Sequence, residues 1–389
     1  MTETDGADAG AGAGAEGMER KYVASVVLHA LGDTFGFNNG EWEFNHFKDV
    51  ITLDTTNELL YEFIALGGIN AINLEGWRVS DDTLLNMAMI RGLLRSGRSF
   101  DERMIINVKE EFVVAYNQMV DDEEKGLDRM PGVTTRRYIE KFEKGHDGRD
   151  LPYDKTSGGN GAAMRAGCIG LAYPLEEDRE TLIRVAIETS RLTHNSAIGY
   201  LGGLTVALLT AFAVEGVPLE KWPFKLIDLL TSDAVTRYVR ERGNEDEIDD
   251  HERYVGYWRK YVDTRFDGGR PIMARAQTNL IFRSRYYYEN FTRGTGSLLI
   301  GESGFCATIM AYDSLLDARD VWEKLVIYSA LHFGDSDTVC AIASSWYGTL
   351  YGFGDVPAQN LRYLEFREEL TGLARSMYRK YWDRDLGSS

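Results

Sequence analysis

The feature that most restricts the fold of this chain is the spacing and length of its apolar segments. Nearly every one of them either repeats with helical periodicity or reaches helical length, and residues 197–214 are uncharged throughout. Few segments show the polar and β-branched alternation that is typical of strands. We therefore expect an all-α fold, in the form of a single compact multi-helix domain with closely packed small-residue helices.

The 197–214 segment is close in length to a membrane span. It contains three glycines and two threonines, and acidic residues follow soon after it, so a buried core helix is favoured over a transmembrane helix. Residues 1–19 are rich in Ala, Gly, Asp and Glu and contain no apolar stretch of the kind found in a signal peptide. We predict a disordered acidic tail at 1–19, followed by one domain at 20–385.

Charge and cysteine content restrict the partners and the compartment. The 389 residues carry a formal net charge of −18. Nucleic acid and anionic membranes both attract basic surfaces, so we expect neither as a partner. Cys168, Cys306 and Cys340 are odd in number and widely spaced, which predicts buried free thiols in a reducing compartment, the cytoplasm. We also expect a monomer.

Two acidic clusters begin apolar helices that lie far apart in the sequence. In Trp77-Arg78-Val79-Ser80-Asp81-Asp82-Thr83, the serine is a favourable N-cap and both aspartates fall in the first turn, where the helix dipole favours anions. Gly334-Asp335-Ser336-Asp337-Thr338 has the same form. Carboxylates and hydroxyls are the ligands that Mg²⁺ prefers. Two carboxylates about 4 Å apart repel by roughly 4 kcal/mol at an effective dielectric constant near 20, so a pocket that holds all four needs divalent cations.

Each cluster alone has simpler interpretations. Both are ordinary N-cap sequences. Asp335-Ser336-Asp337 also matches the DxD motif of nucleotide-sugar glycosyltransferases, although those folds need strands that this sequence lacks. Our hypothesis is that the two helix N-termini meet and that their oxygen atoms share metal.

Three further features could belong to a site. Glu43 lies between two aromatic residues in a loop, where an acid is more often simply solvated. The loop Ser157-Gly158-Gly159-Asn160-Gly161 opens a helix and could present backbone N–H groups to an anion. It matches neither the Walker A motif nor the dinucleotide-binding fingerprint, and close helix packing would also explain its glycines. His194 lies at the turn between two helices, where packing is the simpler interpretation.

Residues 21–31 form the first predicted helix. Gly32 follows directly and Gly36 comes soon after, and a glycine at this point permits the left-handed conformation that ends many helices. We therefore predict that the chain turns back here, with Asp33 in a tight turn. Residues 361–384 are predicted to form one C-terminal charged helix.

The combined motifs resemble those of the ADP-ribosyl-glycohydrolases related to dinitrogenase reductase-activating glycohydrolase, and most closely the ADP-ribosylarginine hydrolases. They occur in the family's order over about residues 20–385. The residues that show this resemblance are Gly32-Asp33-Thr34-Phe35-Gly36, Gly40-Glu41-Trp42-Glu43-Phe44, Trp77-Arg78-Val79-Ser80-Asp81-Asp82-Thr83, Gly161-Ala162-Ala163-Met164-Arg165-Ala166, Arg191-Leu192-Thr193-His194, Met310-Ala311-Tyr312-Asp313 and Gly334-Asp335-Ser336-Asp337-Thr338.

The resemblance implies an all-α fold that encloses a binuclear centre of two Mg²⁺ ions. Glu43 falls where the family places an acid near the metals, so it becomes a catalytic candidate together with Asp81 and Asp82. Gly159-Asn160-Gly161 would hold the diphosphate, and His194 would lie along the ADP-ribose. By match to the family's motifs, the metal ligands would be Ser80, Asp81, Asp82, Asp335, Asp337 and Thr338.

The implied activity is Mg²⁺-dependent hydrolysis of the N-glycosidic bond between ADP-ribose and arginine on mono-ADP-ribosylated proteins. The metals would orient the distal ribose and lower the pKa of a water molecule. Asp82 or Glu43 would act as general base, and a neighbouring acid would protonate the departing guanidine. Hydrolysis of serine-linked or O-acetyl-ADP-ribose is an alternative, as is non-catalytic binding of ADP-ribose.

The sequence departs from the family's pattern at three points. Phe305-Cys306-Ala307-Thr308 stands where arginine hydrolases usually have His-Asp-Ala-Pro, and Phe333 follows His332 where a glycine is usual. No aromatic residue can be matched to the one expected against adenine. The metal-ligand positions are intact, so these departures concern the leaving group more than the hydrolysis.

Overall fold

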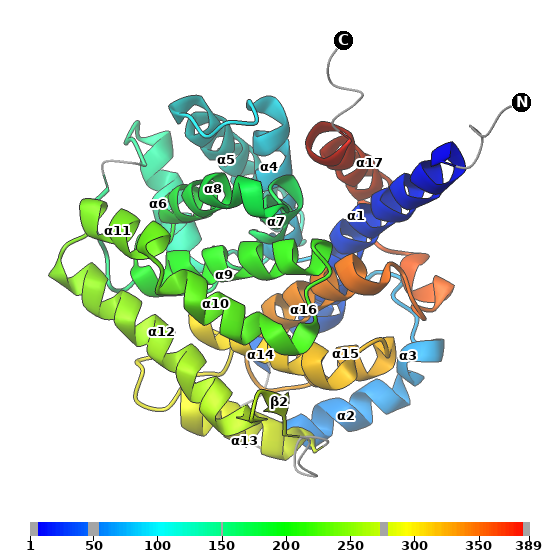
Figure 1. Cartoon of the computed structure of the whole chain (residues 1–389). Helices are drawn as coiled ribbons and strands as arrows, with labels where there is room; N and C mark the ends of the chain where they lie inside the picture. Colours follow the sequence, from blue (N-terminus) through cyan, green and yellow to red (C-terminus); the bar gives the residue numbers. More distant parts are fainter. Residues whose placement is uncertain (1–6, 46–53, 149–150, 273–278, 384–389) are drawn as a thin grey trace, which may run out of the picture.

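The computed structural model describes residues 7–45, 54–148, 151–272 and 279–383, and this part of the chain is almost entirely helical (Figure 1). Its only strands are β1 (Phe266–Asp267) and β2 (Arg270–Pro271), which pair as a short antiparallel hairpin. The all-α prediction is confirmed. The α-helices are α1 Ala7–Phe37, α2 Thr55–Ala65, α3 Gly68–Ala71, α4 Asp81–Arg95, α5 Glu102–Glu124, α6 Val133–Glu143, α7 Gly167–Ala172, α8 Arg179–Arg191, α9 Ala197–Val214, α10 Trp222–Leu230, α11 Asp233–Arg242, α12 Glu245–Arg265, α13 Leu280–Phe291, α14 Gly304–Ala318, α15 Trp322–Ala330, α16 Ser336–Tyr351 and α17 Arg367–Met377.

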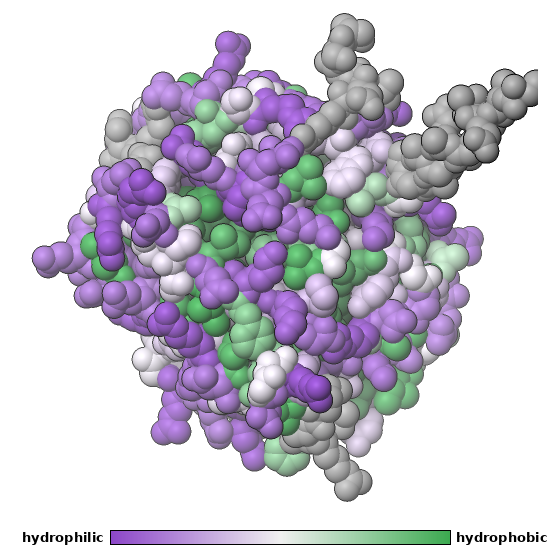
Figure 2. Space-filling model, in the orientation of Figure 1, coloured by the Kyte–Doolittle hydropathy of each residue, from purple (hydrophilic) through white to green (hydrophobic). Residues whose placement is uncertain are grey.

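Helix α9 lies at the centre of the fold, with α7, α8, α12 and α14 packed around it (Figure 1). It is long and apolar enough to cross a membrane, but the surrounding helices bury 89% of it. The prediction of a buried core helix at 197–214 is confirmed. On the face in Figure 2, hydrophilic side chains predominate and apolar ones are interspersed toward the middle. The three cysteines are buried free thiols, as predicted.

Helices α1 and α16 lie side by side and form the most extensive helix contact in the structure (Figure 1). Two glycines of α1 face α16. A Cβ atom on Gly32 would lie 2.5 Å from the carbonyl oxygen of Cys340, and one on Gly36 would collide with the backbone of Ser336. The predicted helix end at Gly32 is therefore wrong, because α1 continues to Phe37 and places Asp33 inside the helix.

Other predicted boundaries vary in accuracy. The helices at α4 and α16 begin where their acidic clusters predict, and α8 and α9 are joined by the predicted turn. The predicted helix at 361–384 is shorter, because α17 begins only at Arg367 and continues directly into a π-helical turn, Tyr378–Trp382. Helix α1 begins at Ala7, within the predicted tail. Residues 1–6 of that tail and 384–385 of the predicted domain lie outside the described residues.

Asp313, on α14, belongs to one of the family motifs, and its contacts stabilise the fold. Its carboxylate accepts hydrogen bonds from Arg265 Nε at 2.7 Å and Arg283 Nη2 at 2.9 Å, and also from Tyr261 and Tyr287. Burial alone would raise the pKa of Asp313, but the two guanidinium groups outweigh it and lower the pKa to about 2. This buried ion pair network ties α12 and α13 to α14.

Replacement of Gly32 tests the close contact of α1 with α16. Overpacking costs typically about 1–3 kcal/mol, whereas replacing a helical glycine by alanine gains at most about 1 kcal/mol. We expect Gly32→Ala to lower the free energy of unfolding, measured by urea denaturation. Gly256, in α12, is the matched control because a Cβ there meets nothing within 4 Å, so Gly256→Ala should raise stability slightly. Equal stability of the two variants would contradict the packing role of Gly32.

Candidate active site

The N-terminus of α4 is fixed by hydrogen bonds from two directions. Ser80 is its N-cap, as predicted, and its Oγ accepts from the backbone N–H of Asp82 at 3.1 Å. The buried carboxylate of Asp33, on α1, accepts from the backbone N–H of Ser80 at 3.1 Å and from both the N–H and the hydroxyl of Thr83. Burial raises the pKa of Asp33 to about 6, although these hydrogen bonds oppose the shift. Asp33 therefore positions the two aspartates that follow Ser80.

The N-terminus of α16 has a similar construction. Asp335 is its N-cap and accepts from the backbone N–H of Thr338 at 3.3 Å. Ser336 Oγ donates to the carbonyl oxygen of Gly36 at 2.7 Å, which ties α16 to the end of α1. Thr338 Oγ1 donates to Asp82 Oδ1 at 3.4 Å. The two acidic helix N-termini therefore meet, as the sequence predicts.

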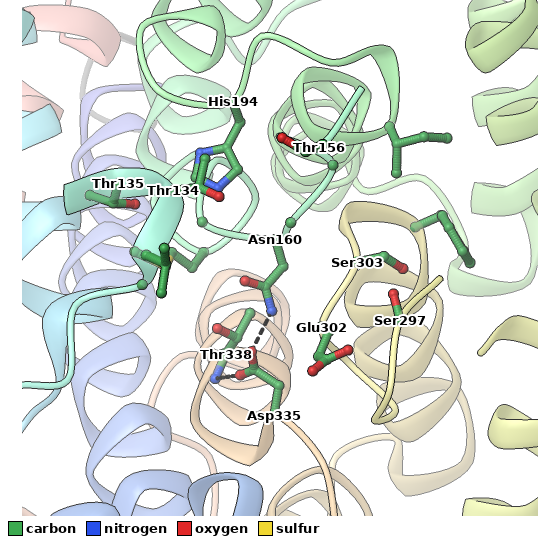
Figure 3. A pocket seen from close by; sticks show the side chains of 18 of the residues that line it. Thr134, Thr135, Thr156, Asn160, His194, Ser297, Glu302, Ser303, Asp335 and Thr338 are labelled. Carbon is green, nitrogen blue, oxygen red and sulfur yellow. Dashed lines mark hydrogen bonds between the residues drawn. The ribbon is translucent and has the colours of Figure 1, made fainter. Parts of the chain in front are cut away.

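Both helix N-termini line one cavity of about 990 Å³. Figure 3 shows Asp335 and Thr338, from α16, in this cavity. Glu43 reaches the same cavity from a 3₁₀ turn at Glu43–Asn45. Of the residues predicted from sequence as site residues, Ser80 alone is absent from the lining, because it is fully buried and its hydroxyl serves as the helix cap. The predicted residues that line the cavity are Glu43, Asp81, Asp82, Gly159, Asn160, Gly161, His194, Asp335, Asp337 and Thr338.

The acidic end of the cavity brings together groups of like charge. Burial, followed by repulsion from neighbouring carboxylates, raises the pKa of Glu43 and Asp82 well above the usual values. The pKa of Asp81 and of Asp337 is raised well above its usual value in the same way. Glu43 Oε2 and Asp82 Oδ2 are buried without a hydrogen-bond partner among the described residues. These carboxylates therefore need protons or cations nearby to offset their burial.

The donor set suits a hard divalent cation such as Mg²⁺, because carboxylate and hydroxyl oxygens are its preferred ligands. The two unpartnered oxygens, on Glu43 and Asp82, are the kind of groups that a cation would satisfy. Within the described residues, however, no three Asp, Glu, His or Cys side chains stand close enough to form a ready ligand group. The residues fit a metal in their chemistry and line one cavity, but their side chains would have to move closer together to share an ion. The residues that would hold it are Asp81, Asp82, Asp335, Asp337 and Thr338.

The glycine loop and His194 form the middle of the cavity (Figure 3). Gly159 pairs with Ser303 in an isolated β-bridge. A Cβ atom on Gly161 would lie 2.6 Å from Cε1 of His194, so only glycine fits beneath this ring. Burial lowers the pKa of His194 well below its usual value, which keeps the ring neutral. His194 is thus a packed residue that also lines the cavity, and its contact with ADP-ribose stays a prediction.

Arg165 links the glycine loop to the turn that carries His194. Its buried guanidinium donates to the carbonyl oxygen of Gly161 at 2.5 Å and to Thr193 Oγ1 at 2.7 Å, and it lies over the ring of Phe112. Thr193 Oγ1 in turn lies 2.8 Å from Nδ1 of His194. Because this hydroxyl accepts from Arg165, it can donate to Nδ1, which leaves the ring proton on Nε2, toward the loop.

Sequence reasoning missed the aromatic end of the cavity. Tyr257, on α12, stacks on Phe305, on α14, with ring centroids 3.9 Å apart and planes 8° apart. Both residues line the cavity. Phe305 is the first residue of the segment that departs from the family's pattern, and no local pattern links it to a tyrosine on another helix. Only the packing of α12 against α14 brings the two rings together.

Comparisons with known proteins agree with the fold and identify the family. The sequence profile described as ADP-ribosylglycohydrolase matches residues 15–386. This chain therefore belongs to the ADP-ribosylglycohydrolase family. By membership it is a hydrolase of the class that removes ADP-ribose.

Three individual relatives match most of this chain. A protein of Acanthamoeba polyphaga mimivirus, named provisionally as an ADP-ribosyl glycohydrolase, is 38% identical over 90% of this chain and 68% of its own. ADP-ribosylhydrolase ARH1 of Dictyostelium discoideum is 30% identical over 91% of this chain and 92% of its own. ADP-ribosylhydrolase ARH3 of Bos taurus is 23% identical over 81% and 82%.

A solved structure supports the fold. The chain titled as an ADP-ribosylglycohydrolase-related protein complex superposes with a TM-score of 0.58. The match covers 94% of this chain and 99% of that one at 23% identity. At this identity the likeness establishes the arrangement of helices and nothing finer.

A charge-neutral replacement of Asp82 tests whether the acidic end binds cations. In EDTA, Asp82→Asn should raise the melting temperature, because it removes one of several repelling carboxylates. Mg²⁺ should stabilise the wild type, by about 2.7 kcal/mol at about 100 times the dissociation constant, and should stabilise the variant much less. Thermal unfolding with EDTA or Mg²⁺ measures both effects.

The matched control is Asp263→Asn, which changes an exposed aspartate on α12. It should alter neither the melting temperature in EDTA nor the stabilisation by Mg²⁺. Equal stabilisation of all three proteins by Mg²⁺ would reject the assignment of Asp82 to the cation site.

Proposed function

We propose that this protein hydrolyses the N-glycosidic bond between ADP-ribose and arginine on mono-ADP-ribosylated proteins, with two Mg²⁺ ions at the acidic end of the cavity. The observation on which this proposal depends is the convergence of two acidic helix N-termini, where Thr338 Oγ1 contacts Asp82 Oδ1. Mg²⁺, when bound, would offset the carboxylate charge, orient ribose hydroxyls and lower the pKa of a water molecule.

The charge of the cavity favours arginine over a neutral leaving group. A guanidinium keeps its positive charge at any physiological pH, whereas a serine-linked ADP-ribose is neutral at the linkage. The carboxylates that line the cavity include those of Glu43, Asp81, Asp82, Asp335 and Asp337. Two Mg²⁺ ions would offset four of these five negative charges, so the charge that remains attracts a cationic linkage more than a neutral one.

The hydrolytic step uses the unpartnered carboxylate oxygens. The bond between ribose C1″ and the guanidine nitrogen breaks as a bond forms from C1″ to the water oxygen. Asp82 Oδ2 or Glu43 Oε2, both buried without a hydrogen-bond partner, accepts the proton that the water loses. A neighbouring carboxyl group donates a proton to the departing nitrogen, so arginine leaves as a guanidinium ion. Burial and neighbouring carboxylates raise the pKa of Glu43 and Asp82, which favours the uptake of a proton by these groups.

The rest of the ADP-ribose would extend from the acidic end toward Tyr257. The backbone of Gly159-Asn160-Gly161 would face the diphosphate, and His194 would lie along the ligand. The ring of Tyr257, backed by Phe305 at 3.9 Å, offers an aromatic face on which adenine could stack. Tyr257 thereby supplies the adenine contact that sequence comparison leaves unassigned.

Other properties stay proposals from the sequence. We propose that the protein is monomeric and cytoplasmic, acts on ADP-ribosylated proteins, and binds neither nucleic acid nor membranes. The net charge of −18 supports the last point.

Hydrolysis of another ADP-ribosyl linkage is the second candidate. It is favoured by Phe305, which departs from the pattern of arginine hydrolases and lines the cavity. The acidic end argues for catalysis of some kind, because a protein that only binds ADP-ribose has no need to bury so many carboxylates together.

A release assay separates these functions. Proteins ADP-ribosylated on arginine or on serine are incubated with the enzyme in Mg²⁺ or in EDTA, and free ADP-ribose is measured. We expect release from arginine in Mg²⁺, little from serine, and loss of activity in EDTA. Asp81→Ala and Asp82→Ala should each reduce release by a factor of 100 or more, on the order of 3 kcal/mol in the barrier, while the fold survives.

The remaining outcomes identify the alternatives. Preferential release from serine would replace the proposed linkage and keep the site. Binding of ADP-ribose without release from either substrate would overturn the enzymatic proposal, as would near-normal turnover by both alanine variants.

A further inference from the structure

Asn160 connects the glycine loop to the acidic end of the cavity. It belongs to the glycine loop, yet its side chain points toward the N-terminus of α16 (Figure 3). We propose that Asn160 is a positioning residue for Asp335, which its side chain holds in the orientation needed for cation binding, and that its side-chain amide does not contact the diphosphate. This inference rests on the proposed function, because it assumes that the acidic end binds Mg²⁺.

The hydrogen bonds of the Asn160 amide leave no donor for a ligand. Nδ2 donates to Asp335 Oδ2 at 2.7 Å and to the carbonyl oxygen of Gly301 at 2.8 Å. A carboxylate and a carbonyl oxygen can only accept, so the amide nitrogen, and not the amide oxygen, must face them. An asparagine amide has two N–H hydrogens, and both are used here.

Backbone hydrogen bonds also link Asn160 and Asp335 to the segment 300–302. The N–H of Asn160 donates to the carbonyl oxygen of Glu302 at 3.0 Å, and the N–H of Asp335 donates to the carbonyl oxygen of Ile300 at 3.0 Å. Gly301 lies between these two bonds, with φ of +87°. A Cβ atom there would lie 2.9 Å from Cβ of Asp335, so the segment 300–302 packs directly on the acid. The glycine loop and Asp335 are thus fixed to one common segment.

The result for Asp335 is a carboxylate with both oxygens oriented. Oδ1 accepts from the backbone N–H of Thr338 at 3.3 Å, and Oδ2 accepts from Asn160. Asp82 and Glu43, by contrast, each have an oxygen without a partner. Asn160 supplies a neutral donor, which orients the carboxylate without cancelling its charge and leaves it able to bind a cation. Residues that hydrogen-bond to metal ligands act in this way.

The experiment compares Mg²⁺ binding with ADP-ribose binding in the full-length protein. Isothermal titration calorimetry gives the affinity for Mg²⁺ alone and, separately, for ADP-ribose, and the release assay gives kcat and KM. Asn160→Ala should weaken Mg²⁺ binding by about 10–100-fold, as is typical for the loss of a group that orients a metal ligand. It should lower kcat at saturating Mg²⁺ while KM changes little. Asn160→Ser retains a hydroxyl donor and should recover part of the Mg²⁺ affinity.

The control is Asn107→Ala. Asn107 is similarly buried and donates from its side-chain amide, to Ser96 Oγ at 3.0 Å, but it lies outside the cavity lining. It should leave Mg²⁺ affinity unchanged, which separates a general loss of packing from a specific effect on Asp335. Thermal unfolding confirms that each variant is folded, and Asn160→Ser serves if the alanine variant is not.

The outcomes distinguish this inference from the proposed function. If the wild type binds Mg²⁺ and Asn160→Ala binds it equally well but binds ADP-ribose more weakly, Asn160 is a ligand contact and the inference is overturned alone. Equal losses of Mg²⁺ affinity in Asn160→Ala and Asn107→Ala would also overturn it. If the wild type does not bind Mg²⁺, the proposed metal-dependent function fails, and this inference fails with it.

Discussion

The hydrogen bonds that tie α4 and α16 to the same end of α1 are the interactions on which the cavity depends. Asp33 caps α4 through Ser80 and Thr83, and one turn later the carbonyl oxygen of Gly36 accepts from Ser336 at the start of α16. Because both bonds are made by one turn of one helix, the two acidic helix N-termini are held at a fixed separation. Their contact does not require any direct attraction between them.

This arrangement explains how the fold tolerates a cluster of buried carboxylates. Each aspartate near a helix N-terminus gains from the helix dipole and from backbone N–H groups, and the packing energy of α1 against α16 offsets the remaining repulsion. The raised pKa of Glu43, Asp81, Asp82 and Asp337 shows that the compensation is incomplete. Groups whose pKa is strongly perturbed by burial and by like charges are typical of functional sites.

The parts of the structure that were predictable from the sequence are those set by neighbouring residues. The N-caps at Ser80 and Asp335 and the central helix α9 follow from local chemistry and periodicity. The role of Gly32 could not be predicted in this way. A glycine is needed there because the backbone of Cys340, on another helix, leaves no room for a side chain. Sequence reasoning used the common rule for a glycine after a helix and placed an end there.

The site shows the same division between local and distant causes. The candidate cavity residues were found because several motifs could be matched to one family, and the cavity indeed collects all of them except Ser80. What each one contacts could not be read from the sequence. The glycine at 161 is needed because His194 lies against it, and the amide of Asn160 faces Asp335 and not open space. The stack of Tyr257 on Phe305 has no sequence pattern at all.

The contact between Ser336 and Gly36 joins residues 300 positions apart. During synthesis, domains fold as the chain emerges, beginning from the N-terminus. Here α1 packs its two glycines, Gly32 and Gly36, against α16, and α16 is made after most of the protein. The largest contact of α1 therefore forms only after residue 351 has been made, and the candidate cavity is incomplete in any shortened translation product that ends before α16.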